Sequence, residues 1–148
     1  MPAPVDLGAA ALGVSLLLLA AIDVRTQRLP DRLTLPLLAA GLALAATEGP
    51  GVLADRAAAA ALAWGVFTAL AAGYRRQRGC DGLGGGDIKL FAAAGAWVGL
   101  ARLPEVALLA ASGALAAIAL AALTTGWTVR RRIPFGPFVA AALWLVWR

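Results

Sequence analysis

Six apolar runs fill most of the chain and leave only short polar connections between them. They cover residues 7–22, 33–46, 52–74, 88–100, 106–129 and 137–147. A helix needs about 20 apolar residues to cross a bilayer, and runs of about 10–14 residues are often re-entrant or buried instead. The second, fourth and sixth runs are short for a span. The pattern predicts an all-α integral membrane protein, a bundle of about six transmembrane helices, with residues 1–148 forming one membrane-embedded domain.

Composition excludes the soluble alternatives. Apolar residues make up 61% of the chain and charged residues 14%, against roughly 45–50% and about 25% in ordinary soluble domains. A soluble domain of 148 residues lacks the interior volume to bury so much apolar surface. The net charge of +5 would otherwise suggest a nucleic-acid partner, but no connection is long enough to build such a platform. We therefore expect membrane lipid, and no nucleic acid, among the partners.

Basic residues are concentrated in alternate connections. Ten of the 13 follow the first, third and fifth runs: Arg25, Arg28, Arg32, Arg75, Arg76, Arg78, Lys89, Arg130, Arg131 and Arg132. Because cytoplasmic loops carry the excess of Lys and Arg, the odd connections are predicted to be cytoplasmic and both chain termini to lie on the outer side. Trp97, Trp144 and Trp147 then fall near the outer ends of their runs, as an aromatic belt would place them.

The missing residue types restrict the chemistry. The chain has no histidine and a single cysteine, Cys80. A histidine-ligated zinc site and a nucleophile paired with histidine are thereby excluded, and we expect neither a metal nor a cofactor. Any catalysis must rest on Asp, Glu, Lys, Arg or Tyr.

Two aspartates lie at predicted membrane boundaries. Asp23 closes the first run and Asp87 opens the fourth, so both fall at the cytoplasmic face of the predicted topology. An aspartate at this depth should face a protein-lined cavity or water, because contact with lipid is costly. Each is equally compatible with a polar helix end and with a functional group. Asp31 follows a proline and precedes an apolar run, so we interpret it as a helix cap.

Asp87 follows a glycine-rich stretch, residues 82–86. The stretch lacks the Gly-Lys-Ser/Thr ending of a phosphate-binding loop and the acidic ladder of a calcium loop. A flexible connector is one interpretation. The other is a site, because glycines directly before an acid let a ligand or another backbone approach closely.

Three motifs along the chain resemble those of the type IV prepilin peptidases, a family of intramembrane aspartyl proteases. Residues Gly84-Gly85-Gly86-Asp87 fit the GxGD signature of such proteases, and the likeness continues through residues 88–90 and 94–99. Residues 22–25 and 29–36 resemble an earlier motif, and residues 133–138 resemble the last one. The three motifs occur in family order, which is more specific than GxGD alone.

The resemblance implies an aspartic endopeptidase of the bacterial cytoplasmic (inner) membrane, crossing it several times. Its substrates would be type IV prepilin or pseudopilin precursors of pilus and secretion systems, cleaved after the basic leader at the cytoplasmic face. Asp23 and Asp87 would be the catalytic pair. Positions expected to shape the site or bind substrate are Gly84, Gly85, Gly86, Lys89, Pro134, Phe135 and Gly136.

Some of these positions have a simpler interpretation. Lys89 is expected to anchor at the membrane surface rather than pair with Asp87, and Phe135 and Phe138 to pack in the core more than to line a groove for substrate. The chain also resembles the short form of the family, because it lacks the N-terminal cytoplasmic region with paired cysteines. That departure argues against N-methyltransferase activity. The sequence does not give an oligomeric state.

Two neighbouring carboxyl groups can divide the work of peptide hydrolysis, because like charges at close range favour one ionised and one protonated group. Asp87 opens a predicted helix and Asp23 closes one, so the helix dipole favours Asp87 as the ionised base and Asp23 as the acid. Two other function classes remain open. One is a catalytically inactive scaffold for pilus or secretion assembly, and the other a small proton-coupled carrier.

Overall fold

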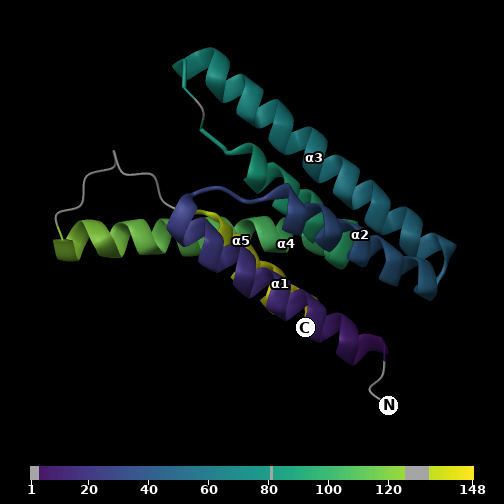
Figure 1. The fold of residues 1–148 in the computed structure, drawn as a ribbon. Coiled ribbons are helices and arrows are strands. Elements are labelled where there is room, and N and C mark those ends of the chain that lie inside the picture. The colour runs from purple at the N-terminus through teal and green to yellow at the C-terminus, as the bar shows by residue number, and fades with distance from the viewer. Residues whose placement is uncertain (1–3, 81, 126–133) are drawn as a thin grey trace.

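The computed structural model describes residues 4–80, 82–125 and 134–148, and helices are the only regular elements in this part of the chain (Figure 1). Their bounds are α1 (Pro4–Thr26), α2 (Asp31–Glu48), α3 (Pro50–Arg78), α4 (Gly85–Thr125) and α5 (Gly136–Trp147). The predicted all-α class is confirmed. The basic cluster at residues 130–132 lies outside the described residues.

Three of the helices are long and apolar enough to cross a membrane: Gly8–Thr26, Pro50–Arg78 and Gly85–Thr124. Helix α5 is apolar but shorter. These lengths agree with a membrane protein, whereas the count of six crossings and the sides on which the termini lie stay predictions.

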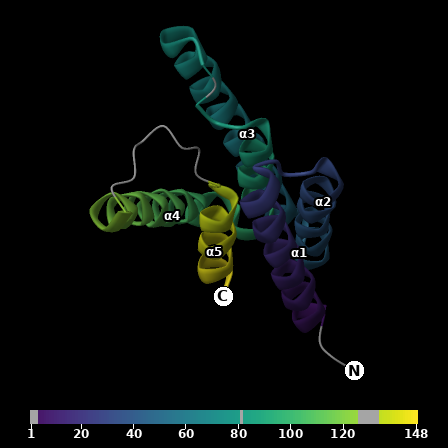
Figure 2. The ribbon, with the colours of Figure 1, turned by 60° about the vertical axis from the view of Figure 1, so that its left-hand side comes forward.

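The fourth and fifth predicted runs form one long helix, α4, with a break at Gly99. Gly99 has φ 77° and ψ −179°, a conformation outside the helical region that glycine adopts readily. Figures 1 and 2 show the part of α4 after the break leaving the other helices at an angle. The two runs are thus two helical segments, as expected, but they meet at the Gly99 kink and not across a connection at residues 101–105.

An aspartate of α3 stabilises this break. The Asp55 carboxylate accepts a hydrogen bond from the backbone N–H of Leu100, 3.2 Å away, and so caps the second part of α4. A Cβ atom at Gly99 would lie 2.2 Å from the Asp55 Oδ2 atom, so glycine is required here for space as well as for φ.

Removing this cap should weaken the protein. We expect Asp55→Ala to lower the free energy of unfolding by about 0.5–2 kcal/mol, the range for loss of a helix N-cap. Unfolding in mixed detergent micelles, followed by circular dichroism, measures the change. Glu105→Ala removes an exposed carboxylate of α4 and serves as the control. Equal free energies of unfolding for the two variants would show that the Asp55 contact does not stabilise the protein.

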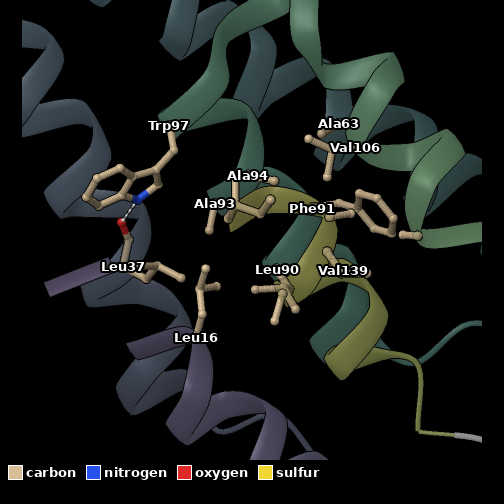
Figure 3. Packing of buried hydrophobic residues seen from close by; sticks show 14 of the residues in the cluster. Leu16, Leu37, Ala63, Leu90, Phe91, Ala93, Ala94, Trp97, Val106 and Val139 are labelled. Atoms are coloured by element: carbon tan, nitrogen blue, oxygen red, sulfur yellow. Dashed lines mark hydrogen bonds between the residues drawn. The ribbon is translucent and has the colours of Figure 1, made fainter. Parts of the chain in front are cut away.

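The first part of α4 forms the centre of the molecule. Every residue from Leu90 to Trp97 is buried (Figure 3), with α2, α3 and α5 packed around this helix. Small residues allow the close approach. A Cβ at Gly95 would lie 2.7 Å from the Ala59 backbone of α3, and one at Gly41 of α2 would lie 2.8 Å from the Trp97 ring.

Trp97 corrects one expectation. Its side chain is only 2% exposed, and its indole N–H donates to the Leu37 carbonyl of α2 at 2.8 Å (Figure 3). It is a core residue that joins α4 to α2 and not a member of an aromatic belt. Its indole still packs edge-on against Trp147, with 5.7 Å between ring centroids.

Helices α1 and α5 pack together and run in opposite directions (Figure 2). The buried face of α1 carries Leu12, Leu16 and Leu19, and that of α5 carries Val139 and Leu143. This packing places the C-terminal end of α1 beside the N-terminal end of α5.

Candidate active site

Asp23 continues the buried face of α1. Leu12, Leu16, Leu19 and Asp23 follow one another at steps of four, three and four residues, so they lie on one side of the helix. The aspartate is 5% exposed. Its Oδ2 atom accepts a hydrogen bond from the backbone N–H of Gly136, the first residue of α5, at 2.8 Å. The carboxylate thus faces protein and not lipid.

Asp87 is the third residue of α4, and its carboxylate turns back to the residue before the helix. The backbone of Gly84 hydrogen-bonds the Asp87 carboxylate, while the Gly84 carbonyl accepts the N–H groups of Asp87 and Ile88 at 3.0 and 3.3 Å. This is the acidic half of a capping box. The Asp87 side chain is half-buried, so it remains partly open to solvent.

The two carboxylates lie at the same end of the bundle, near enough to interact electrostatically. The ends of α1, α4 and α5 converge there, because Asp23 is bound to the start of α5 and the start of α4 packs on the segment that follows α1. Each carboxylate is held by a backbone N–H donor, Gly136 for Asp23 and Gly84 for Asp87.

With this geometry, the helix dipole no longer distinguishes which of the two aspartates is ionised and which is protonated. Asp23 closes α1, but its carboxylate lies at the N-terminus of α5, where free N–H groups favour an anion. Asp87 lies at the N-terminus of α4. Both acids therefore have a helix N-terminus beside them, and the assignment of Asp87 as base and Asp23 as acid loses its basis.

The glycines before Asp87 differ in the space around them. A Cβ at Gly86 would lie 2.7 Å from the Leu29 Cβ atom, in the connection between α1 and α2. One at Gly84 would lie 3.3 Å from Asp87 Oδ2, and one at Gly85 would meet nothing within 4 Å. Space is thus restricted at the two fixed glycines of the GxGD pattern and open at the variable one.

This difference gives a direct test with matched substitutions. Gly86→Ala should push the start of α4 away from Leu29 and displace Asp87, lowering any activity of the pair by up to about 100-fold. Gly85→Ala, at an exposed position in the same turn, should retain the wild-type rate. Steady-state rates of the two purified variants decide the matter. If they lose activity equally, glycine at these positions is needed for flexibility and not for space.

Lys89 has a partner that the sequence did not identify. Its Nζ atom pairs with the Asp31 carboxylate at the start of α2. The expectation that Asp31 caps α2 is wrong: the N-cap residue is Pro30, and no side-chain hydrogen bond caps this end. The ion pair is partly exposed, so it contributes at most about 1 kcal/mol. It holds the first turns of α2 and α4 together and, as expected, leaves Lys89 unpaired with Asp87.

The described residues of the last motif, 134–138, lie partly at the site and partly in the core. The backbone N–H of Gly136 donates to Asp23 at the site. The Phe135 ring lies 6.1 Å from that of Phe91, and the Phe138 ring packs against Gly113 of α4, where a Cβ atom would lie 3.2 Å from it. Both aromatic residues belong to the core, as expected, while Pro134 is half-buried just before α5. The contact between Gly136 and Asp23 had no local signal in the sequence.

In the part of the chain that the structure describes, the groups identified at this site are carboxylate oxygens and backbone N–H donors. Among residues 4–80, 82–125 and 134–148, no group of three or more His, Cys, Asp or Glu side chains could hold a metal ion. A pair of carboxyl groups, each oriented by a backbone N–H, is equipped to accept and to donate protons.

Comparison with known proteins agrees with the motifs. The sequence model of the type IV leader peptidase family matches residues 10–129. Leader peptidase HopD of Escherichia coli is 42% identical, over 84% of this chain and 81% of its own length. A prepilin leader peptidase/N-methyltransferase of Burkholderia pseudomallei is 43% identical, over 95% of this chain and 45% of its own length.

An Escherichia coli K12 protein with that double name is 42% identical, over 84% of this chain. The chain thus spans about half the length of the relatives named for both activities, with 45% and 55% of their lengths covered. No solved structure matches the chain. The match of the family model over most of the sequence, together with the HopD likeness over most of both chains, shows that this protein belongs to the type IV leader peptidase family.

Proposed function

We propose that the protein is an aspartic endopeptidase of the bacterial inner membrane that removes the basic leader from type IV pilin-like precursors. The observation that carries the proposal is the placement of Asp23 and Asp87 at the same end of the bundle, with Asp23 bound to the start of α5 and the start of α4 packed against Leu29. The names of the relatives support peptidase activity and a prepilin substrate. The basic end of α3, with Arg75, Arg76 and Arg78, favours a cytoplasmic location for this end of the bundle.

In the proposed reaction, a water molecule lies between the two carboxyl groups. The ionised carboxylate takes a proton from this water as its oxygen attacks the scissile carbonyl carbon. The protonated carboxyl group donates its proton, first toward the carbonyl oxygen and then to the leaving amine as the C–N bond breaks. One water is consumed, and the products are the leader's new carboxyl end and the pilin's new amino end. The proton belongs to the pair and not to either residue.

The donors from Gly136 and Gly84 fix the orientation of the two carboxylates. A hydrogen bond to each carboxylate holds one oxygen in place and leaves the other available to water or substrate. Such preorganisation is worth several factors of ten in rate, because reacting groups that are held in position need no further ordering.

The test is cleavage of a defined precursor. Purified protein in vesicles is mixed with a type IV prepilin, and the pilin N-terminus is read by mass spectrometry. We expect a single cut at the junction between the basic leader and the apolar helix of the precursor. An uncut precursor across several prepilins would favour the scaffold, and proton-driven transport without a shortened product would favour the carrier.

A further inference from the structure

An apolar groove runs between α1 and α5, and one of its ends lies close to Asp23. Its volume is about 360 Å³, within the range of about 300–1,000 Å³ for binding pockets. Ala20 and Pro137 line the end nearest the aspartates. Ala20 precedes Asp23 by one turn, and Pro137 follows Gly136, the hydrogen-bond donor to Asp23. At the other end the Trp144 ring lies over Gly13, where a Cβ atom would lie 3.1 Å from the ring.

The residues that line the groove follow the same sequence spacing on α1 and on α5. On α1 the lining residues are Gly13 and those three, four and seven positions later. On α5 they are Pro137 and those three, four and seven positions later. This is the stripe that one helix presents to another, so each wall is suited to contact a helix along about two turns.

Size and charge also fit an apolar helix. Four of the eight lining residues are glycine or alanine, which allow a neighbouring backbone to come close, and none is charged. Ala140 is buried at the floor of the groove, whereas Leu17 and Ala141 are exposed at its edges. The groove is therefore open at the outer surface of α1 and α5 and closed toward the core.

We propose that this groove seats the first turns of the apolar helix of the precursor, with the bond to be cut at the end near Asp23. The inference rests on the proposed function and adds where the substrate lies. The closeness of one end of the groove to Asp23 favours this occupant over a lipid chain. A helix that lies against α1 and α5 leaves its N-terminal, extended segment at the two carboxylates, where an exposed peptide bond is needed for attack.

Filling the groove should weaken binding of the helix and spare the chemistry. Ala141→Trp places a bulky ring at the edge of the groove, and Ala61→Trp, at an exposed site of α3, is the matched control. With intact precursor in vesicles we expect Ala141→Trp to raise KM about tenfold or more with kcat little changed. With a water-soluble peptide that contains the leader and only the first few mature residues, kcat/KM should equal the wild-type value.

Photocrosslinking gives a second measurement that does not depend on rates. A benzophenone amino acid at position 141 should form an adduct with the precursor, and one at position 61 should not. If the wild type leaves precursor uncut, the proposed function fails. If the wild type cuts it but Ala141→Trp is indistinguishable from Ala61→Trp, or position 141 crosslinks only to lipid or to a second copy of the chain, the groove does not seat the substrate helix.

Discussion

Asparagine in place of either Asp23 or Asp87 should abolish precursor cleavage, with kcat falling by about 10²–10⁴-fold in each case. The amide has the shape of the carboxyl group but neither takes a proton from water nor delivers one to the leaving amine. Asparagine at position 23 still offers an oxygen to the Gly136 N–H, so the contact between α1 and α5 is kept. Initial rates in vesicles, with folding checked by circular dichroism, measure the loss.

The control is a third aspartate at the same end of the bundle. Asp31 is exposed and pairs with Lys89. We expect Asp31→Asn to cleave at a rate close to that of the wild type.

The double variant adds a sharper test. Residues that act as a unit are not additive, so Asp23→Asn combined with Asp87→Asn should be no slower than the slower single variant. Wild-type cleavage by either single variant would remove that residue from the catalytic pair. Multiplied losses in the double variant would mean that the two residues act independently.

The sequence predicts the class of this fold well, because the signal is hydrophobicity along the chain. The apolar runs at residues 7–22, 33–46 and 52–74 correspond to α1, α2 and α3, and each helix extends the run by a few residues at both ends. These extensions contain polar residues, such as Arg75 and Arg78 at the end of α3. A search for apolar runs does not include such residues.

The path of α4 could not be predicted, because its cause is tertiary. Arg102, Pro104 and Glu105 are typical of a loop, yet they lie inside the helix. The Arg102 guanidinium donates to the Val146 carbonyl near the end of α5, at 3.0 Å, which accounts for a charge at this place. The break lies instead at Gly99, and the cap that stabilises it comes from Asp55 on another helix.

At the site, too, some features could be predicted from the local sequence and others have a tertiary cause. The motifs around Asp23 and Asp87, and the position of both residues at helix ends, identified the candidates from sequence. The environment of Asp23 depends on α5, which returns to α1 more than 100 residues later and presents the Gly136 N–H to Asp23. The contact of Lys89 with Asp31 also joins two helices, so nothing in the local sequence of either residue indicated it.

Gly136→Ala should lower kcat by about 100-fold, because the glycine leaves no room for a side chain beside Asp23. A Cβ there would lie 2.7 Å from the Asp23 Oδ2 atom and 3.0 Å from its Cγ atom. Either the carboxylate rotates away or the start of α5 moves, and each displaces the hydrogen bond from the Gly136 N–H. A shift of about 1 Å in a catalytic group is enough for a loss of this size.

A glycine at the opposite end of the bundle is the control. Gly51 lies in the first turn of α3, where a Cβ atom would have no neighbour within 4 Å. Gly51→Ala should keep the wild-type rate, and its free energy of unfolding should stay the same or rise by up to about 1 kcal/mol, since alanine favours a helix. Rates and unfolding measured on both variants separate a displaced carboxylate from a destabilised protein. If Gly136→Ala cleaves as fast as Gly51→Ala, Asp23 does not need its backbone donor, and the carboxylate pair must be oriented by other contacts.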